Sequence, residues 1–254
     1  MIWSLSMRIA ALLILASASA TATAGGVQAP DTIDLHFYAR PPYVVIGADG
    51  LVTGLTADPA KAAFDGAGVR YRWQQTPAMR QLVLIESGHG MDCGVGWYKT
   101  PEREKFGKFT APLYRDKPTV AIARKQFQPH DRSLAGIVAD PAVRVVMKVG
   151  LTYGHDILDV MAKAKAQVQT VTTEQTTMAR MVASGRADFM FSPQEEAEIL
   201  VADLERPGEG LKVLTLTDIR EGRTRHIVCS KRVSDETIAK LNAALARLHP
   251  GAKP

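Results

Sequence analysis

Short apolar segments alternate with longer amphipathic ones along most of the chain, and this alternation constrains the fold more than any other feature. Strands are expected near residues 35–38, 69–73, 92–96, 118–123, 143–149, 168–171, 187–191, 213–216 and 226–230. Helical patterns lie between most of them. A strand followed by a helix and a second strand is typical of a mainly parallel sheet with both faces covered. The sequence therefore predicts an α/β fold.

Two series of this alternation follow each other, which predicts two lobes. The chain leaves the first series near residues 115–120 and returns to it near residues 218–227. We expect residues 25–117 and 227–254 to form lobe 1, and residues 118–226 to form lobe 2. A cleft between two lobes is the natural place for a ligand.

Residues 92–114 contain the most informative local pattern. Thr100 can cap a short helix through its hydroxyl, and Pro101 has the backbone angle that a first helical turn needs. Arg103 then lies in that turn, just after a strand ends, where ligands bind in open α/β sheets. An arginine at this end opposes the helix dipole, which indicates a functional role. The alternative interpretation is a solvated arginine between two glutamates.

Further helix starts follow from the same capping chemistry. Thr152 and Thr173 are expected to cap two later helices. The helix after Pro77 is expected to bury an apolar side formed by Met79, Leu82, Val83 and Ile85.

Residues 1–24 have the features of a secretory signal peptide. The segment carries one positive charge at Arg8, continues with a short apolar run and ends in the cleavage signal Ala22-Thr23-Ala24. Both Met1 and Met7 are suitable starts. The apolar run is too short to span a bilayer, so we expect the mature chain to be soluble and exported to the periplasm.

Charge and motif patterns argue against several classes of function. The formal net charge is +5, but the lysines and arginines are scattered, so no nucleic-acid partner is expected. The six histidines are dispersed, and no cluster of residues has metal-ligand spacing. The sequence contains no phosphate loop and no dinucleotide fingerprint. We expect neither a metal nor a cofactor.

Cys93 and Cys229 are the two cysteines of the chain. An oxidising compartment would allow a disulfide between them. Each lies in an apolar, strand-like segment, so two buried thiols explain the pattern equally well. The sequence does not show whether the two Cα atoms come within bonding distance, and both interpretations stay open.

Three spaced motifs are shared with a known family. The first is Thr100-x-x-Arg103, followed by Phe109-Thr110 and Tyr114; the second is Gly185-Arg186-Ala187-Asp188; the third is Pro41-Pro42-Tyr43, followed by Asp49-Gly50 and Gly54. In these motifs and in its order of elements, the chain resembles the family 3 periplasmic solute-binding proteins. The resemblance implies the two-lobed periplasmic-binding-protein fold of type II. It also implies a monomer that captures a small solute for an inner-membrane ABC permease.

The resemblance implies ligand contacts in lobe 1. Arg103 would hold a ligand carboxylate, because a guanidinium group meets a carboxylate in two parallel hydrogen bonds. The backbone at Gly96 and the hydroxyl of Tyr98 would add contacts. Trp97 would pack either on the ligand or in the core of lobe 1.

Four further residues are candidates at the cleft, and two of them have an alternative interpretation. Thr152 and Tyr153 would offer free amides to the ligand from a helix start in lobe 2, although Thr152 is equally well explained as a plain cap. Tyr43 belongs to the third motif. Arg40 takes the place of an aromatic residue in many family members, and would be a surface residue or a second positive charge at the mouth.

The sequence departs from the family where an amine would be bound. The acid expected after the second motif is missing at Ser192-Pro193. Glu195 and Glu196 follow closely, but a solvated helix face is the favoured interpretation for them. Carboxylate recognition is therefore better supported than amine recognition, and we expect an amino acid or a relative as the ligand.

Two other functions on this fold stay open. One is an exported lyase that resembles cyclohexadienyl dehydratase, for which His155 and Asp156 would be able to reach the cleft. The other is a receptor that feeds a sensor or a partner enzyme. Tests for turnover as well as binding would distinguish the lyase from a transport receptor and from a receptor that feeds a sensor or enzyme.

Overall fold

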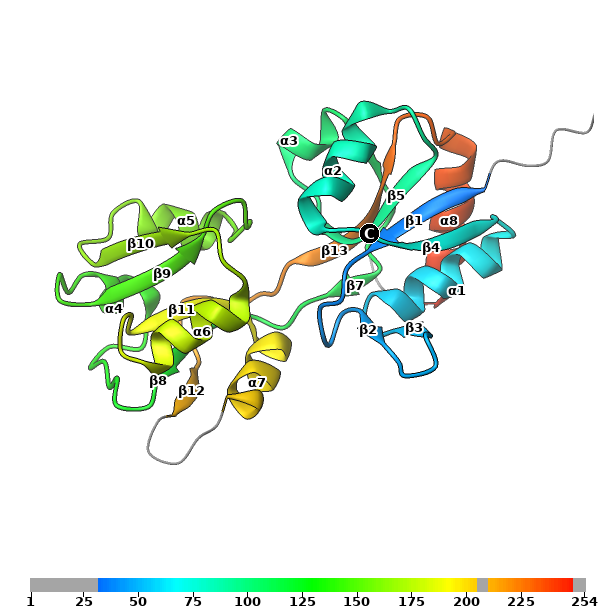
Figure 1. Ribbon diagram of the computed structural model, residues 1–254. Helices are drawn as coiled ribbons and strands as arrows, with labels where there is room; N and C mark the ends of the chain where they lie inside the picture. Colours follow the sequence, from blue (N-terminus) through cyan, green and yellow to red (C-terminus); the bar gives the residue numbers. More distant parts are fainter. Residues whose placement is uncertain (1–31, 205–209, 249–254) are drawn as a thin grey trace, which may run out of the picture. The chain divides into compact units, whose positions relative to one another are not determined.

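The computed structural model describes residues 32–204 and 210–248, and their strands form two larger sheets and one small hairpin (Figure 1). The hairpin joins β2 (Val45–Ile46) to β3 (Val52–Thr53) around Asp49-Gly50 of the third motif. The predicted signal peptide lies outside the described residues. Within these residues, no helix is both long and apolar enough to cross a membrane.

The first sheet has the strand order β4-β1-β5-β13-β6, with β7 paired to β13. Its strands are β1 (Ile33–Phe37), β4 (Tyr71–Gln75), β5 (Asp92–Tyr98), β6 (Gly107–Phe109), β7 (Tyr114–Arg115) and β13 (Thr224–Ser230). Strands β4, β1 and β5 are parallel, whereas β13 is antiparallel to β5, β6 and β7. The sheet is therefore mixed, and the prediction of a mainly parallel sheet is wrong, because the returning strand β13 runs in the opposite direction.

Four helices accompany the first sheet. They are α1 (Ala57–Ala67), α2 (Ala78–Ser87), α3 (Pro101–Glu104) and α8 (Asp235–Leu248). Helices α1 and α8 pack against each other and share one core with the strands. The predicted apolar side of α2 is wrong in part, because Met79 and Val83 are each 62% exposed. The helix buries Gln81 and Ile85 instead, and Gln81 forms hydrogen bonds with the Thr76 carbonyl and the Trp97 indole.

The second sheet has the order β10-β9-β11-β8-β12. Its strands are β8 (Thr119–Arg124), β9 (Arg144–Lys148), β10 (Gln167–Val171), β11 (Phe189–Pro193) and β12 (Leu211–Leu214). Strands β10, β9 and β11 are parallel, and β8 is antiparallel to β11 and β12. This sheet is mixed as well.

Apolar side chains cover both faces of the second sheet. Successive side chains of a strand point to opposite faces, and Phe189 and Phe191 of β11 accordingly lie in one core cluster while Met190 lies in another. The helices that accompany the sheet are α4 (Leu134–Val138), α5 (His155–Met161), α6 (Gln175–Ala183) and α7 (Gln194–Asp203). Continuous apolar strands of this kind are expected where both faces are buried.

Two of the predicted helix caps are wrong. The cap of α5 is Gly154, which has a φ of 98°, so Thr152 precedes the helix. The cap of α6 is Glu174, one residue after Thr173. In both cases the turn before the helix, which sequence patterns describe poorly, decides where the helix begins. Thr100, by contrast, does accept a hydrogen bond from a first-turn amide.

Cys93 and Cys229 form a disulfide. They face each other on the antiparallel pair β5 and β13, with their Cα atoms 4.0 Å apart. The bridge joins the strand that precedes the whole second sheet to the strand that follows it. The predicted lobe limit at residues 226/227 falls within β13, all of which belongs to the first sheet.

Candidate functional site

A buried ion pair between Arg225 of β13 and Asp116, just after β7, organises the site. Arg225 is only 2% exposed, and two of its nitrogens donate to the two carboxylate oxygens of Asp116 over 2.6 and 2.8 Å. The remaining guanidinium donors reach the Gly96 carbonyl and the Tyr98 hydroxyl. Burial raises the pKa of Asp116, although Arg225 opposes this shift. Four hydrogen bonds thus hold the guanidinium of Arg225 within the protein.

Aromatic rings enclose this ion pair. The guanidinium of Arg225 lies 3.7 Å from the ring centre of Tyr43 and 4.5 Å from that of Tyr98. The hydroxyl of Tyr98 donates to Asp116. Tyr43 is buried in a core cluster, and burial raises the pKa of its hydroxyl far above the ordinary value. The structure therefore places Tyr43 in the core, beneath Arg225.

Arg40 forms a second ion pair, with Glu196 in the first turn of α7. Its Nε and Nη2 atoms donate to the two carboxylate oxygens over 2.9 and 2.7 Å. Although burial disfavours the charge, Glu196 raises the pKa of Arg40 well above its ordinary value. Neighbouring Glu195 accepts hydrogen bonds from the Tyr114 hydroxyl and a backbone amide. Both glutamates are buried, so the prediction of a solvated helix face is wrong.

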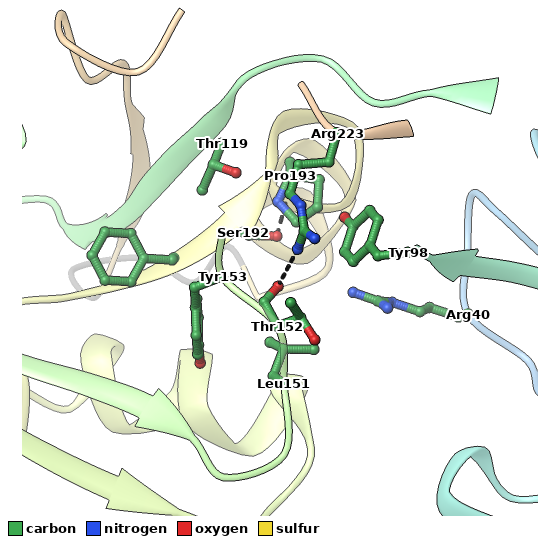
Figure 2. Close-up of a pocket in the computed structure, with 10 residues that line it drawn as sticks. Arg40, Tyr98, Thr119, Leu151, Thr152, Tyr153, Ser192, Pro193 and Arg223 are labelled. Carbon is green, nitrogen blue, oxygen red and sulfur yellow. Dashed lines mark hydrogen bonds between the residues drawn. The ribbon is translucent and has the colours of Figure 1, made fainter. Parts of the chain in front are cut away.

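A pocket of about 320 Å³, part of it open to solvent, lies beside these ion pairs (Figure 2). It is lined by Arg40, Tyr98, Thr119, Leu151, Thr152, Tyr153, Phe191, Ser192, Pro193 and Arg223. Its side chains come from both sheets, since Tyr98 ends β5 and Ser192 belongs to β11. Among the residues that the structure describes, no aspartate or glutamate lines it.

Arg223 lines the pocket between two of the predicted contact residues, Thr152 and Tyr98. Its Nη1 atom donates to the Thr152 carbonyl over 3.0 Å, and its guanidinium lies 4.1 Å from the centre of the Tyr98 ring. Figure 2 shows the side chain of Arg223 between the two. Partial burial lowers the pKa of Arg223.

Arg103 lies in the first turn of α3, as predicted. The Thr100 hydroxyl accepts from its backbone amide over 3.4 Å. Its Nη1 atom donates to the Tyr98 carbonyl over 2.9 Å, and its guanidinium lies 4.8 Å from the Trp97 ring centre. Burial lowers the pKa of Arg103, and the positive charge of Arg223 lowers it further. Within residues 32–204 and 210–248, no carboxylate forms an ion pair with either of these two arginines.

The pocket brings together four of the predicted contact residues: Arg40, Tyr98, Thr152 and Tyr153. The other four, Arg103, Gly96, Trp97 and Tyr43, do not line it. The Gly96 carbonyl is occupied by Arg225, and the Trp97 indole donates to Gln81. The Tyr153 hydroxyl accepts from the backbone amide of Lys148.

Sequence reasoning missed Asp116, Arg223 and Arg225. One signal was present: the two arginines are two residues apart at the start of a strand, a spacing that places side chains on the same face. Their partners, however, are far away in sequence, since Asp116 is 109 residues from Arg225.

Two mixed sheets, joined by two crossings of the chain and lining a shared pocket, define a two-lobed ligand-binding protein of the α/β class. The chain belongs to the bacterial extracellular solute-binding proteins, family 3, whose model matches residues 36–250. Proteins of this family are typically extracellular or periplasmic. A search of curated proteins finds no match.

Solved structures with the same fold include several binding proteins. An ancestral arginine-binding protein bound to arginine is 20% identical, with a TM-score of 0.69, and the match covers 88% of this chain and 94% of that one. An ancestral amino acid-binding protein, described as a precursor of cyclohexadienyl dehydratase, is 21% identical, with a TM-score of 0.66 and coverages of 87% and 90%. A protein of glutathione import in Streptococcus mutans is 17% identical, with a TM-score of 0.68 and coverages of 87% and 90%.

Proposed function

We propose that this protein is an exported solute-binding protein that captures a small carboxylate-bearing solute, an amino acid or a relative, and delivers it to an ABC permease. The lobes would be residues 25–117 with 227–254, and residues 118–226. One observation carries the proposal: Arg103 is half-buried, is held over Trp97, and forms no ion pair with a carboxylate of the described residues.

The energetics of Arg103 favour an anion beside it. Burial lowers its pKa, which means that its charged form is less stable there than in water. A ligand carboxylate would reverse this loss, and charge-assisted hydrogen bonds contribute roughly 1.5–3 kcal/mol each. The arrangement therefore favours binding of an anion at the edge of the pocket.

The groups in the pocket support binding more than catalysis. Its titratable side chains are Arg40, Arg223, Tyr98 and Tyr153. Burial raises the pKa of both tyrosines, so neither is poised to act as a base near neutral pH. His155 and Asp156, considered for a lyase, lie in the first turn of α5 and do not line the pocket.

The test begins with a thermal-shift screen of amino acids, dicarboxylates and polyamines, because a ligand that binds only the folded state raises the melting temperature. The best carboxylate is then titrated into Arg103→Ala by calorimetry. Removing one partner of a buried charge pair is expected to weaken binding by about 2–5 kcal/mol. Arg103→Lys keeps the charge but not the bidentate geometry, so its affinity should lie between that of the wild type and that of Arg103→Ala.

Arg180→Ala is the matched control, because Arg180 is an exposed arginine on α6. It should bind as the wild type does. Unchanged affinity in Arg103→Ala, or stabilisation by polyamines alone, would overturn the proposal. The screened mixtures should also be analysed for products by NMR, since turnover would favour the lyase.

A further inference from the structure

Two arginines beside the pocket have the same unusual set of contacts. Arg103 and Arg223 each donate one hydrogen bond to a backbone carbonyl and each lie against an aromatic face. Each is half-buried. Both contact Tyr98, Arg103 through its backbone carbonyl and Arg223 through its ring, and the charge of Arg223 lowers the pKa of Arg103. Two neighbouring positive charges repel each other, and a single ligand with two negative charges would satisfy both.

The buried acids nearby are already engaged. Asp116 is held by Arg225, Glu196 by Arg40, and Glu195 by Tyr114 and the amide of Lys117. One oxygen of Glu195 has no partner, but it is buried and Glu195 does not line the pocket. Within residues 32–204 and 210–248, a ligand ammonium therefore has no accessible carboxylate in the pocket to bind to.

Two further acids stand near the arginines on the exposed side. Asp156 raises the pKa of Arg223 and Glu102 raises that of Arg103, so both act at a distance. Both side chains are exposed, and neither forms an ion pair with these arginines among the described residues. Solvent screens such charges, so they offset the positive potential of the pocket only in part.

We propose that the ligand is a dianion, such as a small dicarboxylate, which Arg103 and Arg223 bind together and whose recognition requires no ammonium group. This inference rests on the proposed function and narrows its ligand class. It also separates this chain from the neighbour bound to arginine, because Arg223, which lines this pocket and forms no ion pair with a carboxylate of the described residues, repels a cationic ligand.

The test compares three probes by calorimetry: glutarate, glutamate and butyrate. Glutarate and glutamate share two carboxylates and differ in the ammonium group, whereas butyrate has one carboxylate. We expect glutarate to bind at least as tightly as glutamate and at least tenfold more tightly than butyrate. Arg223→Ala should remove most of this preference for glutarate, and Arg223→Lys should restore part of it. Arg180→Ala should retain it.

The outcomes separate this inference from the proposed function. If a neutral amino acid such as glutamine binds more tightly than glutarate, and Arg103→Ala abolishes its binding, the proposed function stands and the dianion is excluded. If Arg223→Ala keeps the full preference for glutarate, the role of Arg223 is excluded. If only cations bind, both proposals fail, and if none of the probes binds at millimolar concentration, the dicarboxylate class is rejected. Circular dichroism establishes that each variant is folded.

Discussion

Arginine residues have three distinct roles around the pocket. Arg225 is paired with Asp116 and donates to oxygens of its own sheet, and Arg40 is neutralised by Glu196. Arg103 and Arg223 keep donors that the described residues do not pair with a carboxylate. The residue type alone did not distinguish these roles, because each depends on partners that are remote in sequence, such as Glu196 at a separation of 156 residues from Arg40.

Replacing Arg225 by methionine should destabilise the protein strongly. The variant leaves Asp116 buried without its charge partner, and breaking a buried pair in this way costs about 3–5 kcal/mol. Urea unfolding measures this loss. The double variant Asp116→Asn, Arg225→Met should lose less than the single variant, because no buried charge remains. A loss below about 1 kcal/mol in Arg225→Met would show that the pair contributes as little as a surface ion pair.

His226 should make the stability depend on mildly acidic pH. Its Nδ1 atom donates to the Thr110 carbonyl, and burial lowers its pKa below the ordinary value of 6.5. Lys99 also lowers the pKa, whereas backbone hydrogen bonds with Thr110 and Ala111 and the charge of Glu104 raise it. Below pH 6.5 the unfolded chain therefore binds a proton that the folded chain does not, and stability falls as the pH decreases.

The measurement is urea unfolding of the wild type and of His226→Gln between pH 7 and pH 5. A single proton difference gives a slope of up to about 1.4 kcal/mol per pH unit. The wild type should lose more stability than the variant over this interval. Equal losses would show that other groups cause the pH dependence.

At the scale of elements, the sequence predicted the identity of most strands and helices but not their directions or exact starts. Apolar runs identify strands such as β9 and β11, because both of their faces are buried. Helix starts were predicted where a side chain forms the cap, as at Thr100, and were wrong where the backbone does so, as at Gly154. The prediction of a mainly parallel sheet was wrong because no local sequence pattern shows in which direction the returning strand β13 runs.

Gly154 should be among the least replaceable glycines. It has a φ of 98° and a ψ of 154°, a region that only glycine adopts readily, and an added Cβ would lie 2.6 Å from a carboxylate oxygen of Asp156. Gly154→Ala is expected to cost roughly 1–3 kcal/mol. Gly185→Ala is the control, because its φ is also positive but nothing lies within 4 Å of its added Cβ. Thermal unfolding should show the larger loss for Gly154→Ala.

At the scale of the whole molecule, the two α/β series and the double crossing were predictable because they depend on the order of elements. The family motif around Arg103 was visible for the same reason: its residues are contiguous. The two ion pairs Arg40–Glu196 and Asp116–Arg225 were not, since they assemble side chains from β13, α7, the loop after β1 and the residue that follows β7. The sequence pointed to Arg103 and to four residues that line the pocket, and the structure adds Arg223.

The Cys93–Cys229 bridge turns everything between these residues into a covalently closed loop that contains the whole second sheet. A single protease cut anywhere between the two cysteines would open this loop without separating the chain into two molecules. A singly nicked protein should therefore migrate at full length on a non-reducing gel and as two fragments after reduction. The variant Cys93→Ser, Cys229→Ser, nicked in the same way, should show two fragments in both gels.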